Sequence, residues 1–485
     1  MYNPRLHFHF IGIGGSGMSG LAEILLSSGF QVSGSDLKAS EISRRLERLG
    51  AKVSIGHAAV HIPPTASLVV YSSAVTPSNP EMREAKRRKL PIVRRAEVLA
   101  ELMRLKYGVG VAGSHGKTTT TSMCGAILEA AELDPTVIIG GQVKARDTGA
   151  RLGKGEFLVA ETDESDRSFL LLKPTVAIVT NIDNEHMNAY RSRQDLDDSF
   201  RRFVEAVPFY GLAILCIDDP VVRQIASECK RRVLTYGFSP EADLVGVNVT
   251  AGRAGMEFGV VYRGAHLGRF KLPMFGRHLV QNCLAAIGVG LEFGVSIEVI
   301  RSALAAFGGV QRRLEVVGVA RGVTVMTDYG HHPTEIRATL RAVRECFGET
   351  LKRLVVIFQP HRYTRTKLCW QEYLTCFKDA DLLLLTEIYA ASEIPIEGIS
   401  GELLSTAVEH TNVEFIPSLE NLRQALLPRL EAGDLVICLG AGSIGAVPEG
   451  LLEALSGSQE SLSDTKIAPS LVALGAELGS LGRED

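Results

Sequence analysis

The sequence predicts an α/β protein of three domains with mainly parallel sheets, and three observations lead to this fold class. The chain has 485 residues, and because ordinary domains contain about 100 to 200 residues, about three domains are expected. Residues 6–29 and 109–131 each pass from a short apolar strand through a glycine-rich turn into a helical pattern. Further apolar strands, separated by stretches of helical periodicity as in a doubly wound sheet, recur at 323–329, 353–358, 381–388 and 434–439.

Composition and charge limit the possible partners. Hydrophobic residues make up 46% of the chain and charged residues 22%, which is typical of a globular protein. A net charge of −3 offers no basic surface for nucleic acid or for a membrane. The N-terminal apolar run is too short for a signal peptide, and no stretch reaches the ~18 apolar residues of a membrane span. We therefore expect a cytoplasmic protein that binds small molecules, with no nucleic acid and no membrane insertion. Monomer and homodimer both remain open.

The first expected domain, residues 1–105, contains a possible diphosphate site. A strand leads into Gly12-x-Gly14-x-x-Gly17, and a second strand ends at Asp36. This spacing is typical of dinucleotide binding, with the acid positioned for ribose hydroxyls. The turn and the helix N-terminus bind any diphosphate, however, including that of a UDP-sugar. A tight turn without any ligand is the structural alternative.

The second expected domain, residues 106–312, begins with a candidate ATP site. Small residues between a strand and a helix let backbone N–H groups approach phosphate oxygens, Lys117 adds a positive charge, and Thr118 offers a hydroxyl to Mg²⁺. The strict phosphate-loop pattern has a glycine five residues before Gly116, where this chain has Val111. The segment is therefore interpreted as a shortened phosphate loop, and a chance glycine turn is the alternative.

Two polar clusters follow apolar strands in the same domain. Glu161 begins the acidic segment that follows one strand, and His186 ends the polar segment after the next. Because the carboxyl ends of parallel strands lie at one edge of a sheet, these side chains are candidates to bind a metal beside the phosphates. A solvated acidic surface and a structural histidine are the simpler alternatives.

The third expected domain, residues 313–455, carries two arginines after an apolar strand. Arg362 and Arg365 can hold a carboxylate or a phosphate through planar bidentate hydrogen bonds, and exposed loop arginines are the alternative. Residues 456–485 change to a Ser- and Gly-rich composition, which predicts a flexible tail.

Taken together, the motifs of this chain resemble those of one family, the Mur ligases of bacterial cell-wall synthesis. They follow the order of the family up to about residue 450, and each is weak on its own. The segments that carry the resemblance are IGIGGSGMSG (11–20), SSAVTP (72–77), GSHGKTTTT (113–121), ETDESD (161–166), TNIDNEHM (180–187), VQRRLE (310–315), DYGHHPTE (328–335) and FQPHRYTRT (358–366).

The resemblance implies a fold and a reaction. The expected domains are a Rossmann-like N-terminal domain that binds a UDP-sugar, a central P-loop ATPase domain with a mainly parallel sheet, and a C-terminal dehydrogenase-like Rossmann domain that receives an amino acid. The implied activity is an ATP- and Mg²⁺-dependent ligation in peptidoglycan precursor synthesis. It would join the lactyl carboxylate of UDP-N-acetylmuramate to L-alanine through an acyl phosphate, giving ADP and phosphate.

The resemblance also assigns residues by motif matching. Catalytic roles fall to Lys117, Glu161 and His186, and the metal would be held by Thr118, Glu161 and His186. The residues implied for ATP are Gly113, Ser114, His115, Gly116, Lys117, Thr118, Thr119, His278, Asn282 and Asp328. The residues implied for the UDP-sugar are Gly14, Gly15, Ser16, Gly17, Asp36, Ser72 and Ser73. The residues implied for the amino acid are Tyr329, His331, Arg362 and Arg365. The chain departs from the family pattern at Ser114, at Thr327, and at Leu279, which stands where the family has an asparagine.

Three alternatives remain at this point. A recycling ligase of the same family would join the same UDP-sugar to a tripeptide, although the ETDESDRSF and HRYTRT segments favour alanine. An NAD-dependent oxidoreductase would explain the first glycine turn and Asp36, but it would leave the segment 113–118 unexplained. A nucleotide-regulated binding protein would form no product.

Overall fold

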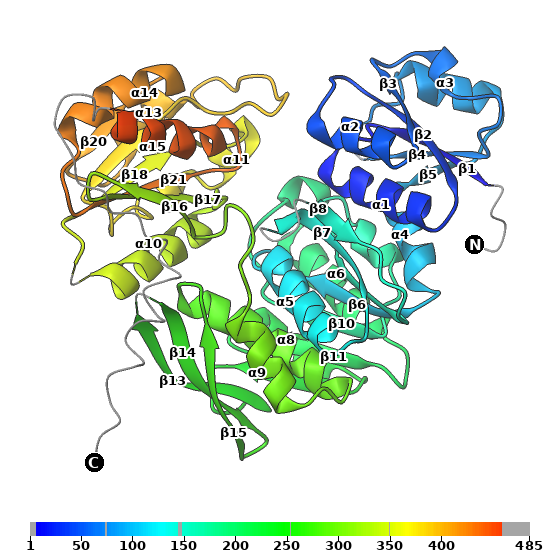
Figure 1. Ribbon diagram of the computed structural model, residues 1–485, viewed down its shortest axis with the longest axis horizontal. Helices are drawn as coiled ribbons and strands as arrows, with labels where there is room; N and C mark the ends of the chain where they lie inside the picture. Colours follow the sequence, from blue (N-terminus) through cyan, green and yellow to red (C-terminus); the bar gives the residue numbers. More distant parts are fainter. Residues whose placement is uncertain (1–5, 73–74, 144–147, 253, 349, 458–485) are drawn as a thin grey trace.

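The chain forms three sheet-centred units, which follow one another along the sequence (Figure 1). The computed structural model describes residues 6–72, 75–143, 148–252, 254–348 and 350–457. Ser73 and residues 458–485 of the expected tail lie outside the described residues. Within the described ranges, no helix is both long enough and apolar enough to cross a membrane.

The first unit is a five-stranded parallel sheet in the order β3-β2-β1-β4-β5. Strand β1 is fully buried, as its apolar sequence predicts, and the glycine turn after it leads directly into α1. The expected strand that ends at Asp36 is confirmed, and the unit closes with a helix at Arg95–Met103. The elements are β1 (His7–Ile11), α1 (Ser16–Ser27), β2 (Gln31–Asp36), α2 (Glu41–Arg48), β3 (Lys52–Ile55), η1 (Ala59–His61), β4 (Leu68–Tyr71), α3 (Pro80–Arg87), β5 (Ile92–Arg94) and α4 (Arg95–Met103).

The second unit is a ten-stranded sheet in the order β15-β14-β13-β12-β11-β10-β6-β9-β7-β8. Strands from β12 to β7 in this order are parallel, and β8 closes one edge antiparallel to β7. Helices α5 and α8 pack against each other. The elements are β6 (Tyr107–Ala112), α5 (Lys117–Ala130), β7 (Thr136–Val143), β8 (Thr148–Arg151), β9 (Phe157–Glu161), η2 (Ser168–Leu171), β10 (Val176–Val179), η3 (Met187–Ala189), α6 (Arg193–Glu205), β11 (Leu212–Cys216), α7 (Pro220–Glu228), β12 (Val233–Gly237), β13 (Leu244–Gly252), β14 (Gly255–Tyr262), β15 (Ala265–Leu272), α8 (Arg277–Glu292) and α9 (Ile297–Ala305).

The other edge of this sheet is an antiparallel extension. Strands β13, β14 and β15 form two successive antiparallel pairs, and β13 joins the main sheet by a short parallel pairing with β12. Along β14 the buried residues Met256, Phe258 and Val260 alternate with more exposed ones. This period of two is typical of a sheet with one buried face, so the extension has a single face toward the core.

The third unit is a six-stranded sheet in the order β16-β17-β21-β18-β19-β20, in which only β16 runs antiparallel. Pro333 occupies the first turn of α10, as expected from its fixed backbone angle. The elements are β16 (Glu315–Ala320), β17 (Val323–Asp328), α10 (Pro333–Phe347), β18 (Arg353–Phe358), α11 (Tyr363–Leu368), α12 (Trp370–Tyr373), β19 (Leu382–Leu385), α13 (Gly401–Ala407), β20 (Val413–Phe415), α14 (Leu419–Leu426), η4 (Leu427–Arg429), β21 (Asp434–Leu439), η5 (Ser443–Ala446) and α15 (Val447–Gly457).

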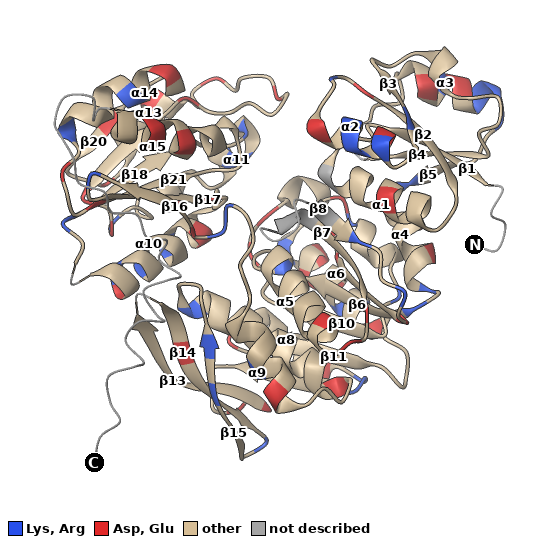
Figure 2. Ribbon diagram, in the orientation of Figure 1, with Lys and Arg blue, Asp and Glu red and all other residues tan. Residues whose placement is uncertain are grey.

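The units also contact one another. Helix α1 of the first unit packs on β7 and β8 of the second, and α10 of the third packs on β13. Figure 2 shows basic and acidic residues interspersed over all three units, in keeping with the small net charge. The expected fold class, three α/β domains with mainly parallel sheets, is confirmed.

Candidate active site

A cavity of about 910 Å³ receives side chains from all three units, and this volume is typical of a small-molecule site. The first unit contributes Gly15, Gly17, Met18, Ser72 and Arg95. Residues of the second unit that line the cavity include Ser114, Gly116, Lys117, Thr118, Glu161, Glu164, Glu185 and His186. Residues of the third unit that line it include Arg313, Tyr329, His331, Arg362 and Arg365. Thirteen of the residues predicted from the sequence therefore line one cavity.

The loop between β6 and α5 has the close backbone approach that a phosphate site needs. Gly113 and Gly116 have φ values of +136° and +82°, which favour glycine. A Cβ atom on Gly113 would lie 2.0 Å from the Oγ1 atom of Thr180, and one on Gly116 would lie 2.6 Å from the Oδ1 atom of Asn282. No side chain fits at either position, so the loop stays narrow where the helix begins.

Lys117 begins helix α5, and its side chain folds back over the loop. Its Nζ atom donates to the carbonyl oxygens of Gly113 at 2.5 Å and Ser114 at 3.0 Å, and to Glu164 Oε1 at 2.7 Å. Burial alone would lower the pKa of Lys117, but Glu164 and Glu161 raise it above its usual value. The ammonium group is therefore charged at neutral pH and lies at the cavity wall.

Oxygen ligands for a hard cation gather beside this lysine. The Oγ1 atom of Thr118 donates to Glu161 Oε2 at 2.9 Å. Glu164, Glu185 and His186 place one ligand atom each within 4.8 Å of one another. The buried atoms Glu164 Oε2 and Glu185 Oε1 accept no hydrogen bond from any residue that the structure describes. Carboxylate and hydroxyl oxygens are the ligands that Mg²⁺ prefers, and buried carboxylate atoms without a hydrogen bond are suited to bind a cation.

Burial shifts two pKa values in this cluster, and the shift of His186 suits a metal. Burial raises the pKa of Glu164 to about 7, although Lys117 opposes the shift. Burial lowers the pKa of His186 to about 4, so its imidazole is neutral at pH 7 and keeps a lone pair for a cation.

The predicted amino-acid residues lie on the third-unit side of the cavity. Arg365 donates from Nη1 to His361 Nδ1 at 3.0 Å, and its Nε atom lies 3.7 Å from Glu185 Oε1. The Nε2 atom of His331 lies 3.7 Å from the same oxygen. Arg362 has a φ of +69° at the start of α11. Two units therefore meet around Glu185, with Arg365 and His331 of the third unit facing this carboxylate of the second.

The predicted UDP-sugar residues divide into a cavity wall and a supporting turn. The N–H group of Gly14 donates to Asp36 Oδ2 at 2.8 Å, so this carboxylate holds the glycine turn. A Cβ atom on Gly17 would lie 2.5 Å from Arg95 Nη1, and Arg95 Nη2 lies 3.3 Å from Asp163 Oδ2 in the second unit. Arg95 thus links the glycine turn to the acidic loop.

Some predicted ATP residues do not line this cavity. The two carboxylate oxygens of Asp328 accept hydrogen bonds of 2.7 Å from the backbone N–H groups of Leu314 and Gly330. Burial raises the pKa of Asp328 above its ordinary value. Leu279 is 4% exposed and belongs to the core. The other residues outside the wall of this cavity are Gly14, Asp36, Gly113, His115, Thr119, His278 and Asn282.

Several charged residues of the site were not selected from the sequence. Each lies inside one of the sequence motifs described above, but a motif does not show which of its polar side chains faces the cavity. These residues are Glu164, Asp183, Glu185, Arg313, His332 and Glu335. For all of them except Arg313, the signal that could have found them is the run of polar residues directly after β9, β10 and β17.

Comparison with known proteins gives a family for all three units. Sequence models described as the Mur ligase family catalytic domain, the Mur ligase middle domain and the Mur ligase glutamate ligase domain match residues 7–107, 111–290 and 312–442. A protein of Anaeromyxobacter sp. (strain Fw109-5), named UDP-N-acetylmuramate--L-alanine ligase, is 52% identical over 452 residues, which cover 92% of this chain and 98% of that protein. A protein of the same name from Myxococcus xanthus (strain DK1622) is 51% identical over 450 residues, covering 92% of this chain and 94% of the relative.

Solved structures agree with this assignment. The crystal structure of a UDP-N-acetylmuramate-alanine ligase from Thermotoga maritima matches with a TM-score of 0.79 and 27% identity, covering 94% of this chain and 100% of that one. A murein peptide ligase from Psychrobacter arcticus shares the fold, with a TM-score of 0.68 and 23% identity over 95% of this chain and 100% of its own. By its sequence and by the arrangement of its three domains, the chain belongs to the Mur ligase family.

Proposed function

We propose that this chain is an ATP-dependent ligase that joins L-alanine to the lactyl carboxylate of UDP-N-acetylmuramate in peptidoglycan precursor synthesis. Relatives with this activity in their name are about half identical to it over nearly the whole chain. The observation that carries the proposal is the shared cavity, because it is lined by a phosphate loop, by acids for a cation and by arginines for a carboxylate.

The reaction needs an activated carboxylate and a positioned amine. In the first step a carboxylate oxygen of the sugar nucleotide attacks the γ-phosphorus of ATP, the bond to the β-γ bridging oxygen breaks, ADP leaves and an acyl phosphate forms. In the second step the neutral amine of L-alanine attacks the acyl carbon, and phosphate leaves. Phosphoryl transfer depends mainly on positioning and on charge neutralisation, which is what the charged groups of this cavity supply.

The residues of the chain divide these tasks. Lys117 would exchange its bonds to Glu164 and the loop carbonyls for oxygens of the β- and γ-phosphates. Arg362 and Arg365 would hold the carboxylate of alanine, with Tyr329 and His331 beside it. Gly15, Gly17 and Ser72 would contact the sugar nucleotide. Domain boundaries near residues 105 and 312 agree with this division and remain predictions.

Mg²⁺ is the metal that the donor set favours. Thr118, Glu161 and His186 would hold it, with Glu164 and Glu185 close by. A bound Mg²⁺ would neutralise charge on the transferred phosphoryl group.

The proposed reaction is tested by measuring phosphate release from ATP in the presence of UDP-N-acetylmuramate. Release is expected with L-alanine and not without an amine. Release with a tripeptide but not with alanine would identify the recycling activity instead. Release that needs neither the sugar nucleotide nor an amine would contradict a ligase, and reduction of NAD would favour an oxidoreductase.

The assignment of alanine to the third domain predicts the effect of Arg365→Lys. Lysine keeps the charge but loses the planar fork, so the KM for alanine should rise about tenfold, or about 1.4 kcal/mol. The KM for ATP should change little. Both constants are measured in one enzyme preparation by phosphate release.

The matched control is Arg341→Lys on α10, because Arg341 is 74% exposed and pairs only with Glu345 among the described contacts. A rise in the KM for ATP at constant KM for alanine would place Arg365 at the phosphates, contrary to this assignment.

A further inference from the structure

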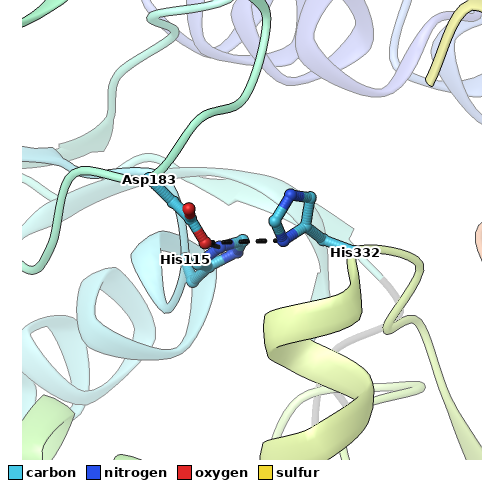
Figure 3. A group of neighbouring side chains, drawn as sticks. All are labelled: His115, Asp183 and His332. Carbon is cyan, nitrogen blue, oxygen red and sulfur yellow. Dashed lines mark hydrogen bonds and ion pairs between the residues drawn. The ribbon is translucent and has the colours of Figure 1, made fainter. Parts of the chain in front are cut away.

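The side chain of His115, in the loop between β6 and α5, points toward the third domain. The backbone of His115 is tied to the segment after β10: its N–H group donates to Asn181 Oδ1 at 2.9 Å, and its carbonyl oxygen accepts from Thr180 Oγ1 at 2.6 Å. Figure 3 shows the imidazole directed toward Asp183 and toward His332 at the start of α10. The ring is therefore held at the boundary between two domains.

Each ring nitrogen of His115 lies beside a different carboxylate. The Nε2 atom lies 3.0 Å from Asp183 Oδ2 in its own domain, and the Nδ1 atom lies 3.3 Å from Glu335 Oε1 in the third domain. Thr334 of the third domain also donates to Asp183 Oδ2, at 2.7 Å. The Nδ1 atom makes no hydrogen bond to any residue that the structure describes, so its link to Glu335 is an ion-pair contact. Only a protonated imidazole has an N–H group facing each carboxylate, so the positive charge of His115 adds to the other contacts between the two domains.

The contact continues to the predicted alanine site. Glu335 uses its other oxygen, Oε2, to accept from the backbone N–H groups of His331 at 3.0 Å and His332 at 3.2 Å. His331 lines the cavity. Three residues, His115, Glu335 and His331, therefore connect the loop before α5 with the wall of the predicted amino-acid site.

We propose that His115 is a positioning residue, which through Asp183 and Glu335 holds the amino-acid domain against the nucleotide loop so that the amine reaches the acyl phosphate. The inference rests on the proposed function for the identity of the amine. The contact itself does not depend on that function, because it is a property of two domains in this chain.

Charged groups from every neighbouring element act on this ring. Burial alone would lower the pKa of His115, but the hydrogen bond to Asp183 and the nearby carboxylate of Glu335 raise it to about 10. The ionisable groups that surround it are Asp183 and Glu185 after β10, His332 and Glu335 on α10, His278 on α8 and Arg313 before β16. Because the pKa is raised from 6.5, the ion pairs contribute fully below pH 6.5 and are lost as the pH rises through about 10.

A metal ion is the competing occupant. His115, Asp183 and His332 place one ligand atom each within 4.8 Å of one another. A cation there would need an unprotonated nitrogen of His115, whereas both nitrogens face carboxylates. The geometry favours a proton over a metal.

The test is a double-mutant cycle with His115→Gln, Glu335→Gln and the double variant, because glutamine keeps the approximate size and removes the charge. Each single change should raise the KM for alanine about tenfold. The KM for alanine of the double variant should lie within about twofold of that of the poorer single variant, because all three variants lose the same contact. The Kd for ADP, measured by calorimetry without the other substrates, should change less than twofold.

Small-angle X-ray scattering supplies a readout that is independent of activity. Both single variants should have a larger radius of gyration than the wild type, and so should the wild type above pH 10. Glu345→Gln is the matched control, because it makes the same change on α10 at a residue whose partner is Arg341. It should leave all three measurements unchanged.

The possible outcomes separate the alternatives. A raised Kd for ADP with an unchanged KM for alanine would place His115 in the nucleotide site and overturn the inference. Additive effects in the cycle, or scattering equal to that of the wild type, would also overturn it. If a chelator increased the radius of gyration of the wild type in the absence of substrates, a metal would be the link. If the wild type showed no alanine-dependent phosphate release, the proposed function would fail, and the scattering comparison would still decide whether His115 joins the domains.

Discussion

Replacing Lys117 with alanine is expected to slow ATP-dependent turnover by about a thousandfold or more, which corresponds to about 4 kcal/mol of transition-state stabilisation. The reason is the position of its ammonium group: Lys117 begins α5, and its Nζ atom lies within hydrogen-bond distance of two loop carbonyls. Charge develops on the γ-phosphoryl oxygens during transfer, and no other lysine lines the described part of the cavity. The measurement is the kcat for phosphate release with both co-substrates saturating.

The free energy of unfolding should fall by less than the ~3–5 kcal/mol that is typical when one partner of a buried ion pair is removed. Glu164 would lose its partner, but burial already raises the pKa of Glu164 to about 7. Without Lys117 this carboxyl can take up a proton and remain neutral. Thermal unfolding should therefore show a moderate loss of stability.

Lys173→Ala is the matched control, because Lys173 is exposed on the same domain. It should turn over at the wild-type rate. A Lys117→Ala enzyme that folds and turns over ATP nearly as fast as the wild type would show that the segment 113–118 is not the phosphate site.

Loss of Glu161 should have the second-largest effect, seen in the response to magnesium. Glu161→Gln keeps the shape of the side chain and its contact with Thr118, but it removes a negative charge from a site for a hard cation. The Mg²⁺ concentration for half-maximal activity should rise by about 10- to 100-fold, as for other lost metal contacts. His186→Ala should shift the titration in the same direction. The activity at saturating Mg²⁺ should recover in part.

Glu156→Gln serves as the control for this titration, since Glu156 is exposed and directly precedes the strand that ends at Glu161. Its Mg²⁺ dependence should match the wild type. Unchanged titrations in both Glu161→Gln and His186→Ala would return these two residues to a structural role.

Local sequence patterns predicted most of the elements. Strand β2 ends at Asp36 as expected, and Pro333 lies in the first turn of its helix. These features depend on neighbours in the sequence: apolar periodicity, glycine turns and the fixed φ of proline. The antiparallel strand β16 was not predicted, although its sequence EVVGVA is apolar, and most of its residues are only half-buried.

The site could be predicted only in part, for a related reason. The motif around residues 161–166 contains four acids, and Glu161 was selected from it, whereas Glu164 forms the ion pair with Lys117. Asp328 was expected near the nucleotide, and its carboxylate instead accepts from two backbone N–H groups at the start of its domain. A sequence motif shows that acids are present, but the direction of each side chain depends on backbone angles and on partners far along the chain.

The sequence by itself therefore determined the three α/β domains, the glycine-bounded loop before α5 and the types of residue present in the cavity. These follow from short-range physics: strand and helix periodicity, the freedom of glycine at positive φ and the charge of single side chains. Only the tertiary structure decided that Lys117 pairs with Glu164 and that Arg365 approaches Glu185. It also decided that the side chain of His115, in the loop before α5, contacts Glu335 of the third domain. Those contacts join residues 47 to 220 positions apart, and the packing of three separate sheets brings them together.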